Sequence, residues 1–424
     1  MGAVIQRLKD CIPLQTRGRL KNKYLSKWYA TSYSRRRCLA RLEEVRRKPV
    51  VNVVFQIEDL AKWKCNSVLK AMCGDARFRA CAWFVGRSTM SAEERAEGLQ
   101  LARDFFSREH LPLVECGSFA DFPPEASPDI VFIVEPYFFI LKEPCNGGLL
   151  DKLVCYVPYS VRNTDRPDEY NGILTHAALF NFYENPHIAS IGRKCMEGGG
   201  RNIIVTGHPI ADAFMEEAAG KQAWPRAGAR KRVIWAPHWT VGESDSYFTT
   251  STFLQYADLM LSLARKYESD IQFCFKPHPM LFQRLCSLEG WGEERAAAYY
   301  RAWRDMPNAQ YESGEYVDLF KQSDALIHDC GSFMVEYLFA DKPCMYLLRG
   351  SGALPSLNRM SREALECHCP GRTPGDIETF LQEVVLGGLD PMRARRAAYR
   401  REYLVPPNGL SAAQNIINAI LPRE

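Results

Sequence analysis

Short apolar runs recur along the first half of the chain, separated by polar or amphipathic stretches that are long enough for helices. These runs are residues 50–55, 78–85, 111–115, 129–134, 153–157 and 202–206. Continuous apolar runs of strand length are typical of a parallel sheet that helices cover on both faces. A helix is predicted to begin near Ser91, because a serine followed by Glu93 and Glu94 suits a first turn. The pattern predicts a doubly wound α/β domain over residues 50–217.

A second series of the same kind follows residues 218–231, a stretch rich in Gly, Ala, Pro and Arg that has no periodicity. Strands are predicted at residues 232–236, 271–276, 325–329 and 343–348, and helices at 252–266, 291–305, 332–340, 390–401 and 411–421. We therefore expect the domain boundary in the aperiodic stretch and a second doubly wound domain over residues 231–424. Two such domains predict a cleft that the carboxyl ends of both sheets face, where ligands bind in this architecture.

The composition excludes several classes of protein. The chain has 424 residues, of which 46% are hydrophobic and 25% charged, so it is globular and long enough for two or three domains. It has no apolar run of roughly eighteen residues, which excludes a membrane-spanning helix, and no apolar signal-peptide core, so secretion is not expected. The most apolar stretch, Asp129 to Leu141, is interrupted by Glu135 and Pro136, and we interpret it as a buried strand with its exit loop.

The cysteines indicate a reducing compartment. Fifteen of them are scattered through apolar stretches without a Cys-x-x-Cys pair, which is typical of buried thiols in a cytosolic protein. The Glu-Cys-His-Cys run at residues 366–369 offers ligands that lie too close together to share one tetrahedral ion easily. We therefore predict no metal site there.

Positive charge is concentrated at the beginning of the chain. Residues 1–50 contain fourteen Lys and Arg against three Asp and Glu, a net charge of +11, whereas the remainder, with forty against forty-seven, carries −7. Tyr24 and Trp28 are interleaved with these cations, a combination that suits an anionic membrane surface. A solvated arm is the plain alternative, and nucleic acid, which attracts the same side chains, is not the expected partner. We predict a basic arm over residues 1–49 that binds an anionic membrane through residues 1–48, on the cytoplasmic face of the cell membrane.

Three segments that follow predicted strands of the second domain contain most of the candidate chemistry. They are Trp235-Ala236-Pro237-His238-Trp239, Phe275-Lys276-Pro277-His278-Pro279, and residues 323–333, which end in His-Asp-Cys-Gly-Ser-Phe. Three of the eight histidines lie in these segments. A single histidine is more often a structural residue, but three at equivalent strand ends indicate a ligand site, because doubly wound domains bind ligands there.

The third segment has the pattern of an anion site. A strand is predicted to end at Asp329, and Gly331 with Ser332 forms the turn that opens the next helix, whose first N–H groups attract negative charge. Gly331 lets a ligand approach the backbone, and the Ser332 hydroxyl can cap the helix and donate to a phosphate oxygen. Glu336, one turn on, can accept hydrogen bonds from ribose or polyol hydroxyls, or simply complement the helix dipole. The sequence has no Gly-x-Gly-x-x-Gly or P-loop motif, which disfavours dinucleotide and P-loop chemistry.

His278 lies between two prolines directly after a predicted strand. The prolines restrict the backbone on both sides, so the imidazole has a constrained position. As a cation or donor it can neutralise a diphosphate leaving group, with Lys276 beside it, and as a neutral base it can accept a proton. A rigid turn with an incidental histidine is the alternative.

Taken in order, these segments resemble the CDP-glycerol glycerophosphotransferase family, which contains the teichoic acid polymerases and primases. Thr206-Gly207-His208-Pro209 is similar to the family's Thr-Gly-Tyr-Pro, Trp235–Trp239 to its Tyr-Ala-Pro-Thr-Trp, and Lys276–Pro279 to its Arg-Pro-His-Pro. The segment Ser323–Glu336 is similar to three family motifs in order: Ser-Asp, then Thr-Asp-Tyr-Ser-Ser, then a single Asp. Asn408-Gly409 looks like the family's terminal Asp-Gly-Lys-Ala-Ser. The resemblance covers about residues 150–420.

The resemblance implies a GT-B-like fold and the transfer of an alditol phosphate, glycerol phosphate or similar, from a CDP-alditol to a hydroxyl of a cell-surface glycan or lipid-linked acceptor, with release of CMP. It places His278 on the family's donor-side catalytic histidine, and Asp329, Ser332 and Glu336 on donor phosphate and polyol or ribose positions. We predict catalytic roles for His278, His238 and Asp329. The predicted donor-binding residues are Lys276, Gly331, Ser332, Phe333, Glu336, Thr206, Gly207 and His208. The sequence requires no cofactor, and a divalent cation held by the donor phosphates is compatible with it.

The chain departs from the family pattern on the acceptor side. The family has a histidine in Thr-Trp-His-Gly after a first-domain strand, where this chain reads Tyr156-Val157-Pro158-Tyr159-Ser160. The acceptor-side candidates therefore stay open among Tyr159, Ser160, His176 and Asp165. His238 replaces a threonine and Thr240 an arginine, so His238 is expected to supply the missing charge. The alternatives are a GT-B glycosyltransferase or epimerase that acts on a nucleotide sugar, for example in capsule or O-antigen synthesis, and a non-catalytic membrane-docked assembly protein.

Overall fold

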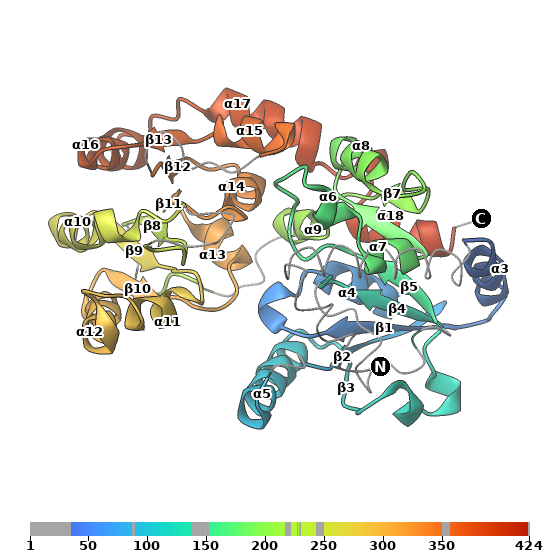
Figure 1. Cartoon of the computed structure of the whole chain (residues 1–424). Helices are drawn as coiled ribbons and strands as arrows, with labels where there is room; N and C mark the ends of the chain where they lie inside the picture. Colours follow the sequence, from blue (N-terminus) through green and yellow to red (C-terminus); the bar gives the residue numbers. More distant parts are fainter. Residues whose placement is uncertain are drawn as a thin grey trace, which may run out of the picture. The chain divides into compact units, whose positions relative to one another are not determined.

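The computed structural model describes residues 35–86, 90–136, 149, 152–216, 222–226, 228, 230–242, 250–349 and 357–422. These residues form two compact units (Figure 1). Unit 1 comprises the described parts of Met1–Ser160, Arg166–Asp212 and Pro406–Glu424, and unit 2 those of Val161–Asp165 and Ala213–Val405. Among the described residues, no helix is long and apolar enough to cross a membrane.

Unit 1 is built on a parallel sheet of seven strands in the order β3-β2-β1-β4-β5-β6-β7. The strands are β1 (Val51–Ile57), β2 (Phe78–Phe84), β3 (Leu113–Val114), β4 (Ile130–Ile133), β5 (Leu153–Tyr156), β6 (Phe180–Tyr183) and β7 (Ile203–Val205). In the register of the middle strands, Phe55 lies opposite Phe132 and Ile133 opposite Tyr156. The apolar runs predict all of these strands except β6, whose short Phe-Asn-Phe-Tyr sequence contains a polar residue.

Helices connect the strands of unit 1 and bury apolar residues against both faces of the sheet. They are α3 (Arg35–Arg46), α4 (Asn66–Cys73), α5 (Ala92–Arg108), α6 (Pro167–Tyr170), α7 (Ile173–Ala177), α8 (Pro186–Cys195) and α18 (Ala412–Ile420), with 3-10 turns η1 (Leu60–Lys62), η2 (Phe119–Asp121), η3 (Pro124–Ala126) and η9 (Pro407–Gly409). Helix α9 (Ile210–Met215) begins in unit 1 and ends in unit 2. The predicted start of α5 is confirmed, since Ser91 and Glu94 form a capping box at its N-terminus.

Unit 2 has a parallel sheet of six strands in the order β10-β9-β8-β11-β12-β13. The strands are β8 (Lys231–Ala236), β9 (Ile271–Phe275), β10 (Ala309–Tyr311), β11 (Ala325–His328), β12 (Cys344–Leu347) and β13 (Cys369–Gly371). In Figure 1 they follow one another from β13 at the top of the unit to β10 at the bottom. The short edge strands β10 and β13 are not predicted from the sequence, because they contain too few apolar residues to form a run. The predicted α/β class with two doubly wound parallel sheets is confirmed, and the cleft between them stays a prediction.

The helices of unit 2 are α10 (Phe253–Lys266), α11 (Leu281–Cys286), α12 (Gly292–Asp305), α13 (Val317–Gln322), α14 (Phe333–Glu336), α15 (Arg359–Leu365), α16 (Pro374–Thr379) and α17 (Arg393–Tyr399). A 3-10 turn, η6 (Tyr337–Ala340), continues α14, and two π-helices, η7 (Phe380–Leu386) and η8 (Arg400–Leu404), continue α16 and α17. Aromatic rings dominate the core beneath β8 and β9, where Trp235 contacts Phe253, Phe275 and Trp303. These contacts fix the strands whose ends carry the candidate site.

The predicted domain over residues 231–424 is wrong at its end. The C-terminal helix α18 belongs to unit 1, where Ile416 and Ile420 are fully buried in the core. The Asp212 carboxylate accepts hydrogen bonds from the N–H groups of Ala412 and Ala413, at 2.7 and 2.9 Å. The helix returns because its apolar face covers the first sheet and its N-terminal N–H groups gain a carboxylate.

The predicted boundary within residues 218–231 is also displaced, because the units divide after Asp212. Trp224 lies inside the predicted linker but is buried in unit 2, and its indole N–H donates to the Leu319 carbonyl at 3.2 Å. A short stretch of the predicted first domain, Val161–Asp165, belongs to unit 2 as well, where Thr164 forms an antiparallel bridge with Leu357.

The predicted basic arm over residues 1–49 is wrong for its last part. Helix α3 packs on unit 1 through Cys38, Leu42 and Val45, all of which are buried. The guanidinium of Arg46 donates to the carbonyls of Ile420 and Ala419 at the C-terminal end of α18, at 2.8 and 3.0 Å. The folded part of the chain therefore includes α3, and residues 1–34 of the predicted arm lie outside the described residues.

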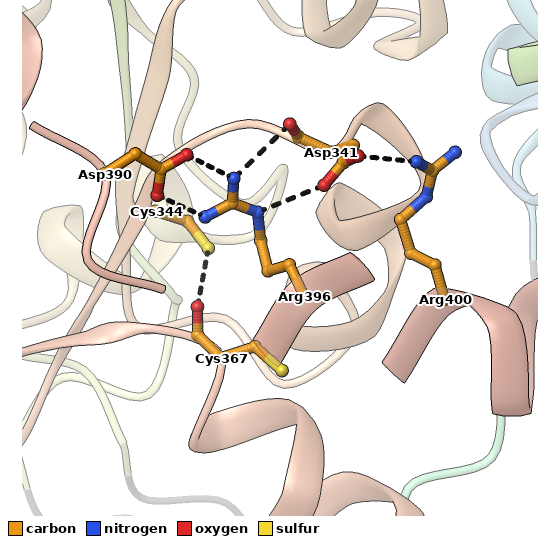
Figure 2. A network of polar contacts seen from close by, with 6 residues as sticks. All are labelled: Asp341, Cys344, Cys367, Asp390, Arg396 and Arg400. Carbon is orange, nitrogen blue, oxygen red and sulfur yellow. Dashed lines mark hydrogen bonds and ion pairs between the residues drawn. The ribbon is translucent and has the colours of Figure 1, made fainter. Parts of the chain in front are cut away.

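A buried arginine holds the C-terminal helices of unit 2 to the connection between β11 and β12 (Figure 2). Arg396 on α17 is 1% exposed, and its guanidinium donates to both carboxylate oxygens of Asp390, at 2.8 and 2.6 Å. Its Nε lies 3.4 Å from the carboxylate of Asp341, which also accepts a hydrogen bond from Arg400 at 2.7 Å. Bidentate pairs of this kind are the strongest charge-assisted contacts, so the network attaches α17 to the connection between β11 and β12.

Candidate active site

Three neighbouring strands of unit 2 carry the predicted site residues at their carboxyl ends. Lys276 follows β9, His238 lies two residues after β8, and Asp329 follows β11. The backbone N–H of His278 donates to the Pro237 carbonyl at 3.0 Å, which ties the first two segments together. The rings of His238 and His278 lie 5.1 Å apart between centroids. The structure therefore brings together the predicted catalytic residues.

The carboxylate of Asp329 holds the backbone of this site through hydrogen bonds. Its side chain is fully buried, and one carboxylate oxygen accepts the backbone N–H of His238 at 2.5 Å. The other accepts the N–H and the hydroxyl of Thr252, at 2.5 and 2.8 Å, at the N-terminus of α10. Burial raises the pKa of Asp329 to about 6, and these hydrogen bonds oppose that rise. Protein donors thus occupy both oxygens, so Asp329 positions the His238 loop.

His278 is a neutral imidazole with a defined tautomer. Burial lowers its pKa to about 4. The Nδ1 atom accepts a hydrogen bond from the N–H of Met280 at 3.2 Å, which leaves the proton of the neutral ring on Nε2. Of the two roles predicted for His278, the geometry therefore favours a hydrogen-bond donor through Nε2–H.

His238 does not carry the positive charge expected of it. Burial, followed by the neighbouring His278, lowers the pKa of His238 to about 3. Its Nδ1 lies 2.9 Å from the Thr240 hydroxyl, which also accepts the N–H of Thr250 at 3.2 Å. The prediction that His238 replaces the charge of the family's arginine is wrong, because an imidazole in this position is neutral at physiological pH.

Lys276 supplies the cation of the site. Its side chain is 5% exposed, and its ammonium donates to the Gly314 carbonyl at 2.6 Å and lies 6.0 Å from the centre of the Tyr316 ring. The Tyr316 hydroxyl donates to the carboxylate of Glu336, which is 2% exposed. The contact of Lys276 with the Tyr316 ring and the hydrogen bond from Tyr316 thus orient the Glu336 carboxylate.

The predicted helix over residues 332–340 is less regular than expected. It is one α-helical turn, α14, followed by the 3-10 turn η6, and the Ser332 side chain makes no capping hydrogen bond. The prediction of a capping Ser332 is therefore wrong. The turn is held instead from Gly331, whose carbonyl accepts a hydrogen bond from the Asn163 amide at 2.9 Å. Phe333 packs its ring against Tyr316 and Phe320.

Asn163 is a site residue that the sequence did not reveal. It belongs to the short stretch of unit 2 inserted between two parts of unit 1, and its own amide oxygen accepts the Ser361 hydroxyl at 3.2 Å. No strand or motif marks this residue, so its contact with Gly331 follows from the tertiary structure alone.

Three of the residues predicted to bind the donor, Thr206, Gly207 and His208, lie in unit 1, after β7. Gly207 has φ +84, and a Cβ atom there would lie 2.7 Å from Pro406. His208 is buried, with Nδ1 accepting the Ile210 N–H at 3.2 Å and Nε2 bonded to the Pro158 carbonyl at 2.9 Å. These contacts explain the residues structurally, because they join the ends of β5 and β7 to the C-terminal segment.

The acceptor-side candidates do not lie together. Tyr159 and Ser160 follow β5 at the carboxyl edge of the sheet in unit 1. His176 is near the end of α7, close to the amino edge, since Leu179 donates to the Val154 carbonyl near the start of β5 at 2.7 Å. Its Nε2 lies 2.6 Å from the Asn171 amide oxygen, and burial lowers its pKa. Asp165 belongs to unit 2. The choice of His176 as an acceptor-side residue is therefore wrong, because ligands of this architecture bind at the opposite edge.

The residues around the Glu-Cys-His-Cys run pack as part of the core. His368 is buried with Nδ1 2.9 Å from the Ala364 carbonyl, and Cys367 donates to the Glu363 carbonyl at 3.3 Å. Within the described ranges, no group of three or more His, Cys, Asp or Glu side chains is placed to hold a metal ion.

The three strand-end segments of unit 2 lie inside the part of the chain that matches a known family. Residues 162–352 match the family model described as CDP-glycerol:poly(glycerophosphate) glycerophosphotransferase. No curated protein matches the chain in sequence.

Solved structures share the GT-B-like fold at low sequence identity. The wall teichoic acid polymerase TagF has a TM-score of 0.58 and 14% identity, over 95% of this chain and 97% of TagF. A UDP-GlcNAc 2-epimerase from Neisseria meningitidis bound to UDP-GlcNAc has a TM-score of 0.55 and 14% identity, over 88% of this chain and 100% of the epimerase. S. aureus MnaA with UDP has a TM-score of 0.54 and 12% identity, over 88% and 96%. At these identities the structures show a common fold only. Over residues 162–352, the chain is therefore similar to the CDP-glycerol:poly(glycerophosphate) glycerophosphotransferase family.

Proposed function

We propose that the protein transfers glycerol phosphate from CDP-glycerol to a hydroxyl group of a glycan or lipid-linked acceptor in cell-envelope polymer synthesis, and releases CMP. One observation supports this most directly. The matched family segment contains Lys276 and His278 after β9, His238 after β8 and Asp329 after β11, at the carboxyl ends of three adjacent strands, where a doubly wound domain binds its ligand.

In the proposed reaction, the acceptor hydroxyl oxygen attacks the phosphorus distal to the cytidine. The bond from that phosphorus to the CMP oxygen breaks, so negative charge grows on the departing CMP phosphate. The Nε2–H of His278, which is half-buried, and the buried ammonium of Lys276 stabilise this charge. Asp329 holds the His238 loop, and Glu336 accepts hydrogen bonds from the glycerol or ribose hydroxyls.

Ligand binding tests the donor. We expect CDP-glycerol and CMP to raise the melting temperature by about 5–10 °C, since saturation at about 100 times the dissociation constant adds about 2.7 kcal/mol and each kcal/mol adds about 2–4 °C. CDP-ribitol, UDP-sugars and GDP-sugars are measured beside them, each with Mg²⁺ and with EDTA. A shift with UDP- or GDP-sugars alone would contradict the proposal in favour of a glycosyltransferase or epimerase. No shift with any nucleotide would favour the non-catalytic alternative.

The membrane-binding arm is predicted over residues 1–48, and because α3 is part of the fold we propose that its first part, residues 1–34, binds the anionic cytoplasmic face of the cell membrane. The charge and the interleaved aromatic residues support this, at about 1 kcal/mol per cation near the lipid. Because α3 is part of the fold, the test removes residues 1–34 only. We expect this deletion to abolish co-sedimentation with anionic liposomes and to leave transfer to a soluble acceptor unchanged. Equal sedimentation of the two proteins would exclude the arm as the anchor.

A further inference from the structure

Two histidine rings lie side by side at the carboxyl edge of the sheet in unit 2. His238 comes two residues after β8, and His278 comes three residues after β9, the neighbouring strand. Their centroids are 5.1 Å apart and their planes are inclined by 65°, so the edge of one ring faces the other. Both residues belong to the same unit and both are half-buried. One ligand at this edge of the sheet can therefore reach the two imidazoles together.

The backbone of His238 is held by the protein on both sides. Its N–H donates to the Asp329 carboxylate at 2.5 Å, directly after β11. Its carbonyl accepts the hydroxyl of Ser251 at 2.8 Å, two residues before α10. These two hydrogen bonds give the imidazole a defined position, which is the first requirement for a group that binds a ligand.

The Thr240 hydroxyl determines which ring nitrogen of His238 carries the proton. Thr240 is fully buried, and its oxygen accepts the N–H of Thr250 at 3.2 Å. The hydroxyl hydrogen needs an acceptor of its own, because a buried donor without a partner is costly. Among the residues that the structure describes, the acceptor within reach is Nδ1 of His238, at 2.9 Å. Nδ1 therefore accepts this hydrogen bond, and the proton of the neutral ring lies on Nε2.

His278 has the same tautomer for a different reason. Its Nδ1 accepts the N–H of Met280 at 3.2 Å, which leaves the ring proton on Nε2. Burial lowers the pKa of His278 to about 4, and burial together with the neighbouring ring lowers the pKa of His238 to about 3. Both rings are therefore neutral at physiological pH. Within the described part of the chain, neither Nε2 atom has a hydrogen-bond partner, so each ring has one N–H to offer to a ligand.

We propose that His238 and His278 form a two-donor site for the diphosphate of the nucleotide donor, and that Thr240 positions His238 within it. This inference rests on the proposed glycerol phosphate transfer. Each Nε2–H donates to a diphosphate oxygen without giving up its proton, and Lys276 supplies positive charge beside them. A diphosphate suits two adjacent donors, because it has negatively charged oxygens on two linked phosphorus atoms. Neutral donors suit the site as well, because two imidazolium rings this close would repel one another.

Nitrogen NMR of the protein with isotope-labelled histidine tests the tautomers. We expect both rings to have a protonated Nε2 and an unprotonated Nδ1, and the variants His238→Gln and His278→Gln identify their signals. Saturation with CDP-glycerol should move both Nε2–H protons downfield, as a hydrogen bond to a charged oxygen does. Thr240→Val removes the donor to Nδ1, so the proton of His238 should also populate that atom. Thr240→Ser keeps the hydroxyl and should keep the wild-type tautomer, a rescue that a purely structural role would not produce.

Binding of CDP-glycerol tests the contact itself. His238→Gln retains an N–H near the position of Nε2, whereas His238→Asn retains one near Nδ1. We expect the dissociation constant to rise about 10- to 100-fold in His238→Asn, the range for a hydrogen bond to a charged group, and less in His238→Gln. Thr240→Val should also weaken binding, and Thr240→Ser should not.

Tyr299→Phe is the matched control for Thr240→Val. It removes another buried hydroxyl of unit 2, which donates to the Ala257 carbonyl at 2.9 Å. We expect this change to lower the melting temperature and to leave both the dissociation constant of CDP-glycerol and the tautomer of His238 unchanged. A loss of binding in Tyr299→Phe equal to that in Thr240→Val would attribute the effect to stability and overturn the positioning role of Thr240.

The remaining outcomes separate this inference from the proposed function. If CDP-glycerol neither binds to the wild type nor yields CMP, the proposed function is wrong and the two-donor site is overturned with it. If CDP-glycerol binds to the wild type and equally well to His238→Asn, or leaves the Nε2–H signal of His238 in place, only the role of His238 is overturned. A wild-type His238 protonated on Nδ1 would overturn the role of Thr240 in the same way.

Discussion

Replacement of His278 by alanine is expected to lower the turnover of CDP-glycerol by at least about 100-fold. One preorganised donor aimed at a developing charge contributes about 3 kcal/mol in comparable sites. His278 fits this role because its Nδ1 accepts the Met280 N–H at 3.2 Å and burial lowers its pKa to about 4, so the neutral ring donates through Nε2. The measurement is the initial rate of CMP release at saturating donor.

Conservative variants distinguish a donor from a base. His278→Gln retains an N–H near the position of Nε2, so it should keep more turnover than His278→Ala if the imidazole donates, and no more if it removes a proton. His110→Asn, which changes a residue of unit 1 outside the segments that form the site, serves as a control and should behave as the wild type. Near-native turnover of His278→Ala would contradict the assignment of the site.

Replacement of Arg396 by methionine is expected to lower the free energy of unfolding by about 3 kcal/mol. Removal of one partner from a buried ion pair typically costs about 3–5 kcal/mol. We expect the lower end of this range of costs because the two carboxylates can still be hydrated: Asp390 and Asp341 keep 20% and 33% of their side chains exposed, whereas Arg396 is 1% exposed (Figure 2). The measurement is urea denaturation followed by tryptophan fluorescence, which reports on the buried Trp235 and Trp303 of unit 2.

The neighbouring arginine provides the comparison. Arg400 is 38% exposed and makes one hydrogen bond to Asp341 at 2.7 Å, so Arg400→Met should cost less than about 1 kcal/mol. Arg396→Lys should fall between the two, because an ammonium cannot form the bidentate contact with Asp390. Equal unfolding midpoints for Arg396→Met and the wild type would mean that the network contributes nothing to stability.

The sequence by itself determined the parallel strands, the capped start of α5 and the order of the three strand-end segments. These features depend on local patterns: an apolar run that both faces of a sheet can bury, or a serine three residues before a glutamate. The same patterns placed Lys276, His278 and Asp329 after the strands β9 and β11, which lie on either side of β8 in the sheet. The short edge strands were missed because they bury too little apolar surface to leave a run.

Only the tertiary structure decided which distant residues meet. A local sequence pattern does not determine the order of strands in a sheet. The ion pair of Lys62 with Glu135 and the hydrogen bond of Asn163 to Gly331 therefore could not be derived from the spacing of residues along the chain. The return of α18 to unit 1 depends on Asp212, about 200 residues before the N–H groups that it accepts. Burial likewise made His238 neutral, because the cost of charging an imidazole depends on everything packed around it and not on its neighbours in the chain.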